Sequence, residues 1–247
     1  MTSAHVKIRA MSSSSGDVTN NLARVRERIN VAASHAGRHV DEITLIAVSK
    51  THSARKIQEL YEAGVHHFGE NRVQERESKL AHLSGLQATW HMIGHVQKNK
   101  AARAAGLFDS VDTVDSTALA EKLDRARGDL ATGNRLRVLI EVKLGPEPAK
   151  SGIDGKELPR LVEAILRMPH LELRGLMGVP PYFDNPEESR PHFRHLRELC
   201  DAVRAQMGAE LLPVLSMGMS HDLDVAIEEG ATEVRVGTAL FGEREGA

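Results

Sequence analysis

The chain has one cysteine and few aromatic residues among its 247 residues, and these shortages limit what it can be. Because Cys200 is alone, an internal disulfide and a thiolate-clustered metal site are excluded, and a reducing, cytoplasmic location is expected. Aromatic residues make up only 3%, so the core must be aliphatic. No run of about 18 uncharged apolar residues occurs, so we expect no membrane-spanning segment.

The charges nearly cancel, with 32 Lys and Arg against 34 Asp and Glu and a formal net charge of -2. Proteins that bind nucleic acid or anionic membranes usually carry a basic surface, so neither is predicted as a partner. Residues 1–16 contain a run of four serines and lack the apolar segment of a secretory signal. We therefore predict a disordered extension at residues 1–16 and one folded domain at residues 17–247.

From residue 17 onward, short apolar runs alternate with amphipathic segments. The first run, residues 43–48, is rich in β-branched residues and too short for a helix, which predicts a strand buried on both faces. Seven more strands are predicted at residues 66–69, 90–94, 110–114, 136–142, 171–177, 213–217 and 233–236. Helices are predicted from residue 17 and at residues 54–63, 73–83, 99–105, 117–127, 156–167, 190–207 and 223–229.

Eight strand–helix units in about 250 residues match the size of a (β/α)8 barrel. An open doubly wound sheet that binds a dinucleotide would need a glycine-rich turn after its first strand, but Val48-Ser49-Lys50-Thr51 stands there. No proline- or glycine-rich linker divides the chain. We therefore predict an α/β fold, a single (β/α)8 TIM barrel with an extra N-terminal helix.

Lys50 follows the first strand, and chemistry in such barrels gathers at the carboxyl ends of the strands. A lysine amine in a partly desolvated pocket loses its proton more easily, and the neutral amine can attack an aldehyde to form a Schiff base. The alternative is a lysine that extends along the strand end to solvent. Position alone leaves both interpretations open.

Arg235 ends the last strand, which a closed barrel places beside the first. It could bind a phosphate or donate to an aromatic nitrogen, and the alternative is an ion pair with a neighbour such as Glu70. Ser216, Ser220 and Gly237 lie at the ends of the last two strands, where barrels often bind phosphate. The alternative for the serines is helix capping.

The histidines do not indicate a metal site. His91 and His95 are four residues apart, but on a strand and loop this spacing does not direct both toward one ion, so no metal is predicted. Cys200 lies among apolar residues of a predicted helix and is expected to be a small buried side chain.

Seven segments in order resemble one known family. They are AVSKT (47–51), FGENRVQE (68–75), WHMIGHVQKNK (90–100), VDTVDS (111–116), GLMGVPP (175–181), LSMGMSHD (215–222) and VRVGTALFG (234–242). Together they are similar to the pyridoxal-phosphate-binding homeostasis proteins, single-domain relatives of the N-terminal barrel of alanine racemase. One departure is the stretch 143–146, which replaces a more polar stretch usual in the family.

The resemblance implies a barrel that binds pyridoxal 5′-phosphate. It implies that Lys50 forms the internal aldimine, that Arg235 partners the pyridine nitrogen and that Asn71 lies near the ring. It also implies that Ser216, Ser220 and Gly237 hold the phosphate, together with nearby backbone N–H groups.

The resemblance leaves three functions open. The first is a non-catalytic protein of intracellular cofactor homeostasis that buffers pyridoxal 5′-phosphate or delivers it to apo-enzymes, and works as a monomer. The second is an amino-acid racemase that uses Lys50 and Tyr182 as its two bases. Arginine at the pyridine nitrogen disfavours a protonated ring, and no covering second domain is expected, so the first function is preferred. The third is a phosphate-binding barrel enzyme without a cofactor, in which Lys50 is a general base.

Overall fold

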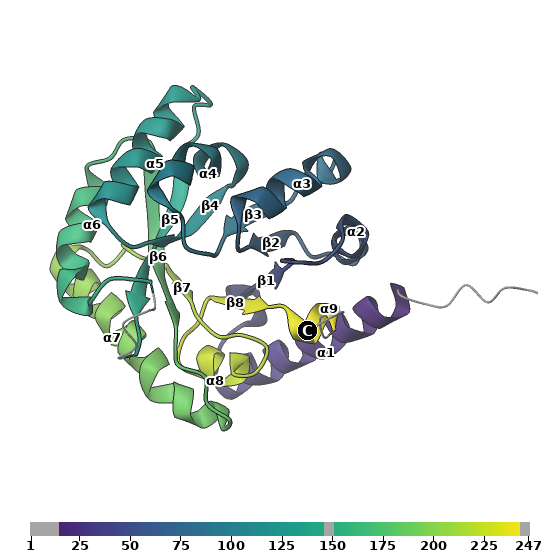
Figure 1. Cartoon of the computed structure of the whole chain (residues 1–247). Helices are drawn as coiled ribbons and strands as arrows, with labels where there is room; N and C mark the ends of the chain where they lie inside the picture. The colour runs from purple at the N-terminus through teal and green to yellow at the C-terminus, as the bar shows by residue number, and fades with distance from the viewer. Residues whose placement is uncertain (1–14, 146–150, 243–247) are drawn as a thin grey trace, which may run out of the picture.

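Eight parallel strands close into a barrel in chain order, β1 to β8, with each strand hydrogen-bonded to the next and β8 to β1 (Figure 1). The computed structural model describes residues 15–145 and 151–242. The strands are β1 (Thr44–Val48), β2 (His67–Glu70), β3 (Thr89–Met92), β4 (Ser110–Val114), β5 (Leu136–Lys143), β6 (Leu171–Val179), β7 (Val214–Ser216) and β8 (Glu233–Val236). The predicted (β/α)8 TIM barrel is confirmed.

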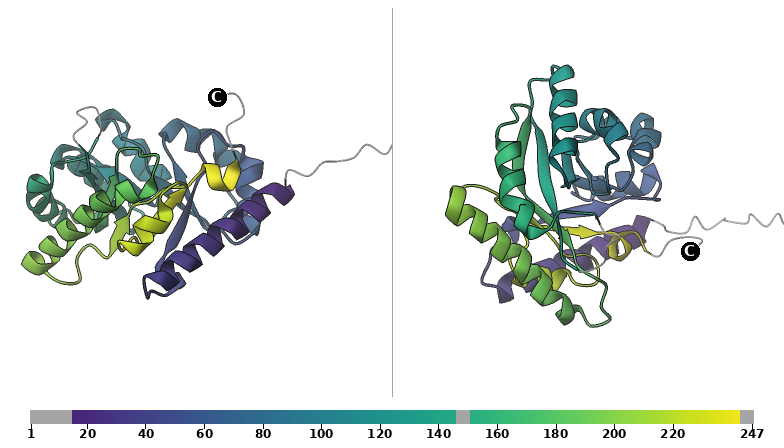
Figure 2. Two further views of the ribbon diagram at one scale, coloured as in Figure 1. Left: turned by 90° about the horizontal axis from the view of Figure 1, so that it is seen from below. Right: turned by 60° about the vertical axis from the view of Figure 1, so that its left-hand side comes forward.

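Helices follow the strands and form the outer layer of the barrel (Figures 1 and 2). They are α1 (Ser15–His35), α2 (Ala54–Glu62), α3 (Val73–Leu83), α4 (Ala101–Leu107), α5 (Thr117–Asp129), α6 (Leu158–Leu166), α7 (Arg190–Met207), α8 (Leu223–Glu228) and α9 (Thr238–Phe241). Short 3-10 turns are η1 (Val40–Glu42), η2 (Lys98–Lys100), η3 (Gly155–Glu157) and η4 (Pro186–Ser189). The extra helix α1 packs against α2, α8 and α9, so the two ends of the barrel chain lie together.

The main apolar core lies between the strands and the helices. Strand side chains that point outward, such as Ala47 and Phe68, are fully buried against helix residues such as Ile57 and Leu60. A second apolar set, formed by Ile46, Val48, Leu139 and Met177, is buried but separate from that core. Successive strand residues point to opposite faces, so this second set fills the inside of the barrel.

Gly69 shows how tightly the inside is packed. A Cβ atom there would lie 2.9 Å from Ile93 Cδ1 and 3.2 Å from Ile46 Cγ2, so only glycine fits between these two side chains. The apolar layer thus extends from β1 past β2 to the residue that follows β3.

The predicted elements differ from the structure at their ends. The strand expected at residues 66–69 is His67–Glu70, because Ile93 N–H donates to Glu70 O and extends the ladder by one residue. The helix expected at residues 99–105 divides into η2 and α4. Of the extension expected at residues 1–16, all but the last two residues lie outside the described residues. Among the described helices, none is long and apolar enough to cross a bilayer.

Candidate functional site

Lys50 leaves β1 directly into the mouth of the barrel. β1 pairs with β8 in the register Ile46↔Arg235 and Ala47↔Val236, which places the residues after Val48 beside Gly237. Lys50 is half-buried, and the next residue, Thr51, has a positive φ of 66° that turns the chain toward α2. The alternation of strand side chains puts Lys50 on the inward face with Ile46 and Val48.

A buried ion pair fixes the backbone on which Lys50 stands. Lys79 Nζ donates to Glu70 Oε1 at 2.6 Å and to the carbonyl oxygen of Ser49 at 2.9 Å. The Ser49 hydroxyl also donates to Glu70 Oε1 at 2.7 Å. The peptide that links Ser49 to Lys50 is therefore held from the helix side of the sheet. The suggested ion pair between Arg235 and Glu70 does not form, because Lys79 occupies Glu70.

The carboxyl group of Glu70 lies in an unusual environment. The residue has no exposed surface, and its Oε2 atom has no hydrogen-bond partner among the described residues. Burial raises the pKa of Glu70, although the Lys79 ammonium and the Ser49 hydroxyl favour the charged form. The network around Ser49 was not predicted, since Lys79 looks like an ordinary residue of an amphipathic helix.

Arg235 lies inside the barrel, opposite Ile46 of β1. It is 4% exposed, and it donates from Nη1 to Ser216 Oγ at 2.8 Å and from Nη2 to the carbonyl oxygen of Gly178 at 3.0 Å. Burial lowers the pKa of Arg235, while the carboxylates of Asp112 and Glu233 oppose that change. A guanidinium has five N–H donors, so these two contacts leave donors for a group bound above it.

The loop between β7 and α8 forms the wall next to Arg235. Gly218 has a φ of 90°, and a Cβ atom there would lie 2.5 Å from Ala226 Cβ, so glycine is required. Arg235 N–H donates to Gly218 O at 3.0 Å and ties this loop to β8. The Ser220 hydroxyl accepts from Ala239 N–H at 3.3 Å, which joins the loop to the turn that begins at Gly237.

Ser216 and Ser220 have different surroundings. Ser216 is fully buried, and its hydroxyl is engaged by Arg235, whereas Ser220 is half-buried in the wall of the mouth. The structure thus brings Lys50, Ser220 and Gly237 to one rim, with Ser216 and Arg235 directly below them.

Asn71 follows β2 on the same end of the barrel. Gly94 packs against its backbone so closely that a Cβ atom would lie 2.2 Å from Asn71 O. Beside Asn71, between α3 and η2, opens a cavity of about 600 Å³ that is also lined by Arg72, Met92 and Lys100. Asn71 thus lines this cavity, whereas Lys50 is not among its lining residues.

Glu141 is a second carboxyl group at the mouth that the sequence reasoning missed. It is 8% exposed, its Oε1 accepts from the Ser151 hydroxyl at 2.7 Å, and its Oε2 has no partner in the described ranges. Burial raises the pKa of Glu141, and the nearby Asp115 acts in the same direction. The signal was a charged residue inside the apolar fifth strand.

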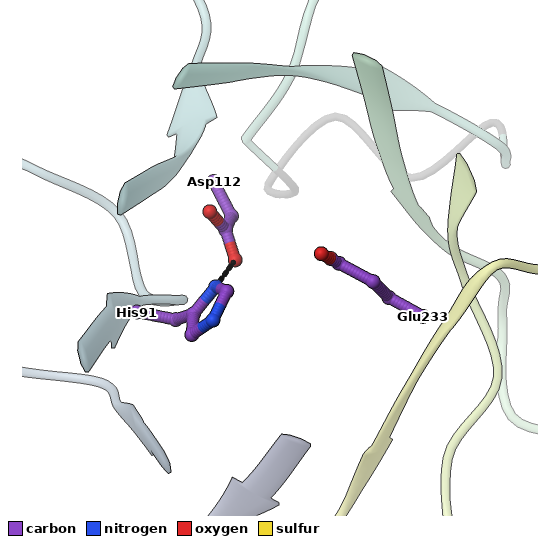
Figure 3. Close-up of side chains that lie close together, drawn as sticks. All are labelled: His91, Asp112 and Glu233. Carbon is purple, nitrogen blue, oxygen red and sulfur yellow. Dashed lines mark hydrogen bonds and ion pairs between the residues drawn. The ribbon is translucent and has the colours of Figure 1, made fainter. Parts of the chain in front are cut away.

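Below Arg235, the inside of the barrel holds four ionisable residues, His67, His91, Asp112 and Glu233, which we call the floor cluster. Figure 3 shows the last three of them. His91 Nδ1 and Asp112 Oδ2 are 3.0 Å apart, and His91 Nε2 is 3.0 Å from His67 Nδ1. The Glu233 carboxylate points from β8 toward His91 and Asp112. His91 thus has a carboxylate neighbour that its spacing from His95 did not reveal.

The floor cluster has strongly perturbed acidities. Burial lowers the pKa of His67 to about 4. Burial also lowers the pKa of His91, but the attraction and hydrogen bond of Asp112 outweigh burial and leave it raised. Burial raises the pKa of Glu233, and the neighbouring Asp112 adds to that effect.

Comparisons with known proteins show which family the chain belongs to. Residues 20–245 match the family of the alanine racemase N-terminal domain. The pyridoxal phosphate homeostasis protein of Aquifex aeolicus is 44% identical over 226 residues, which cover 91% of this chain and 97% of that protein. The protein of the same name from Escherichia coli K12 is 42% identical and is covered to 97%. The chain belongs to the pyridoxal phosphate homeostasis protein family.

Solved structures agree with this membership and confirm the resemblance seen in the sequence. PipY of Synechococcus elongatus, solved without and with pyridoxal phosphate bound, is 40% identical, with a TM-score of 0.80. This chain covers all of PipY, and the match covers 91% of this chain. Alanine racemase of Clostridium difficile is 13% identical with a TM-score of 0.73, and the match covers 57% of it, so it shares the fold alone.

Proposed function

We propose that this protein binds pyridoxal 5′-phosphate at the mouth of the barrel and takes part in its homeostasis, with no catalytic turnover of amino acids. The observation that carries the proposal is the position of Lys50 two residues after β1, at the carboxyl end of a strand that pairs with β8 and its Arg235. The names of the family members and the ligand in PipY support it. We assign this role to the barrel of residues 17–247.

The residues at the mouth fit the chemistry of this cofactor. Lys50 supplies the amine that an aldehyde requires, and Arg235 supplies N–H donors suited to an unprotonated ring nitrogen. Ser220, Gly237 and the backbone N–H groups between β7 and α9 would hold the phosphate, and Asn71 would lie at the edge of the ring. Ser216 would act below the phosphate, because its hydroxyl orients Arg235.

When bound, the cofactor supplies an electrophilic aldehyde and a conjugated ring. The chain's own residues determine how firmly it is held. Lys79 and Glu70 fix the backbone that carries Lys50, and Ser216 with Gly178 O fixes the guanidinium of Arg235. This rigid frame favours retention of the cofactor at one orientation.

The racemase alternative needs a second base opposite Lys50. Tyr182 is 76% exposed, and its ring packs against His221 with centroids 5.5 Å apart, so it lies on the solvent side of the rim. This placement supports the binding function. Solvent deuterium incorporated at the α-carbon of alanine above a free-cofactor control, and lost in Tyr182→Phe, would instead establish the racemase.

The test of the proposal is an absorbance spectrum of the purified protein before and after borohydride, followed by peptide mapping. We expect a visible band that borohydride removes and a reduced adduct on Lys50. Lys50→Ala should lack both, while Lys143→Ala, which removes an exposed lysine at the end of β5, should keep them. An adduct on another lysine would refute the site.

We extend the proposal to delivery of the cofactor to apo-enzymes by a cytoplasmic, monomeric protein. The near-neutral charge and the single buried cysteine support this setting. Transfer from the loaded protein to an apo-enzyme, faster than from free cofactor at the same concentration, would test delivery. A sedimentation measurement would test the monomer.

A further inference from the structure

The floor cluster lies in contact with the residues that would bind the cofactor. Ser216 and Glu233 lie opposite each other in the register of β7 and β8, and the Ser216 hydroxyl accepts from Arg235 Nη1 at 2.8 Å. Glu233 and Arg235 are neighbours on the inward face of β8, two residues apart. A change of charge at Glu233 is therefore felt at Arg235 through a single side chain.

The two carboxyl groups of the cluster are not equivalent. Asp112 is fully buried and has a donor for each oxygen, the Ser110 hydroxyl on Oδ1 and His91 on Oδ2. The Glu233 Oε2 atom, in contrast, is shielded from solvent and has no partner in the part of the chain that the structure describes. The ionised form is therefore stabilised at Asp112 and not at Glu233.

Asp112 and Glu233 lie so close together that the difference in their hydrogen bonding determines which of them is protonated. Donor atoms of His91, Asp112 and Glu233 all lie within 4.8 Å of one another (Figure 3). Two ionised carboxylates this close repel each other, which favours a proton on one of them. The proton goes to the less hydrogen-bonded carboxyl group, which is Glu233.

Charged and titratable groups reach the floor cluster from several strands. They are His67 on β2, His91 on β3, Asp112 on β4, Arg137 on β5 and Arg235 on β8, with Asp109 in the turn before β4. β1 contributes the uncharged Thr44 opposite Glu233, and β7 contributes Ser216. The buried guanidinium of Arg235 already balances ionised Asp112, so a divalent cation is not required to neutralise the cluster.

We propose that Glu233 is a neutral carboxylic acid at pH 7, and that loss of its proton at higher pH weakens binding of the anionic cofactor above Arg235. The second part rests on the proposed function. A new negative charge below the site repels the phosphate-bearing ligand and draws on Ser216, which holds Arg235. Ligand binding and proton retention at Glu233 are then linked, and each favours the other.

The first experiment needs no cofactor. Side-chain carboxyl carbons of the apo-protein are followed by NMR from pH 6 to pH 9, and the signal missing from Glu233→Gln identifies Glu233. We expect the shift of a neutral carboxylic acid at pH 7 and a titration above it. The shift of a carboxylate at pH 7 would overturn the proposal.

The second experiment measures the affinity for pyridoxine 5′-phosphate, which keeps the ring and the phosphate but has no aldehyde, so that Lys50 chemistry does not contribute. Between pH 7 and pH 9 the wild-type affinity should fall roughly tenfold more than that of Glu233→Gln, the order expected for one buried charge. Glu172→Gln, which removes a half-exposed carboxylate paired with Arg174, should follow the wild type.

The outcomes separate the two proposals. Binding with equal pH dependence in the wild type and Glu233→Gln would overturn the coupling alone. No binding at any pH would overturn the proposed function and the coupling together, while the NMR titration still decides the state of Glu233. Should Glu233→Gln fail to fold, calorimetry of the wild type in two buffers at pH 8 should show proton uptake on binding, and its absence would refute the coupling.

A metal in the floor cluster would also refute the proposal, because a cation would then compensate the carboxylates. Elemental analysis of the purified protein and titration with Zn²⁺ test this. Stoichiometric zinc that is lost in Glu233→Gln would show that the cluster is a metal site. Absence of zinc, together with a neutral Glu233, supports the proton site.

Discussion

Removal of the Lys79 ammonium should reduce stability sharply. Lys79→Met keeps the length of the side chain but leaves Glu70, which has no exposed surface, without the cation that lies 2.6 Å from its Oε1. It also removes the donor to Ser49 O. Breaking a buried pair in this way costs about 3–5 kcal/mol of unfolding free energy. In a chain of this size, that corresponds to a fall in Tm of roughly 6–20 °C.

The loss should depend on pH. Burial already raises the pKa of Glu70, and without Lys79 the folded-state value rises further above that of the unfolded chain. A carboxyl group with a raised folded-state pKa contributes stability that is present at low pH and lost as the pH rises through that value. The deficit of Lys79→Met should therefore be small near about pH 4.5 and largest above neutrality.

Urea unfolding followed by the fluorescence of Trp90, the single tryptophan, measures both effects. Arg55→Met is the matched control, because Arg55 is exposed and pairs with Glu59 on the surface of α2, and it should cost less than about 1 kcal/mol. A loss below about 1 kcal/mol at pH 8 for Lys79→Met, or an equal loss at both ends of the pH range, would refute the reasoning.

Three further predictions concern individual residues. Gly94→Ala should cost about 1–3 kcal/mol, because its Cβ would meet Asn71 O at 2.2 Å, and an unchanged urea midpoint would contradict this. Burial lowers the pKa of His67 to about 4, so the unfolded chain takes up a proton first and stability is lost as the pH falls below the ordinary histidine value. His67→Gln should lose less stability than the wild type between about pH 7 and pH 5 in urea titrations, and parallel losses would disprove the assignment. Burial raises the pKa of the Cys200 thiol to about 11, so a thiol reagent should label the native protein only at the rate of unfolding, and rapid labelling without denaturant would show that the thiol is accessible.

The strands of this barrel could be predicted because each is buried on two faces. Residues 43–48 form a short run rich in β-branched residues, and short apolar runs recur along the chain, which defines both the class and the order of the strands. Strand ends could not be placed as well. The extension of β2 to Glu70 depends on Ile93 N–H, a partner from another strand that the local sequence does not specify.

Some residues of the candidate site could likewise be predicted from the sequence, and others could not. Lys50 and Arg235 could be brought together from the sequence, because barrel closure makes the first and last strands neighbours. Lys79 and the floor cluster could not, because Lys79 comes from the helix α3 and Glu233 of β8 meets His91 and Asp112 from strands that are not adjacent to β8. The available signals were weak: a charged residue at an inward position of β4, and another two residues before Arg235.

Glu70 and Glu233 allow a final comparison, since the same substitution should act differently at each. Glu70 faces an ammonium at 2.6 Å, so Glu70→Gln leaves Lys79 as an unpaired buried cation and should cost about 3–5 kcal/mol at pH 7. No lysine or arginine among the described residues forms an ion pair with Glu233, which is proposed to be neutral, so Glu233→Gln should change the unfolding free energy by less than about 1 kcal/mol at pH 7. Above pH 8 the glutamine variant should become the more stable protein, because only the wild type then acquires a buried charge. Equal losses of unfolding free energy for the two variants in urea titrations at pH 7 would show that Glu233 is ionised, as Glu70 is.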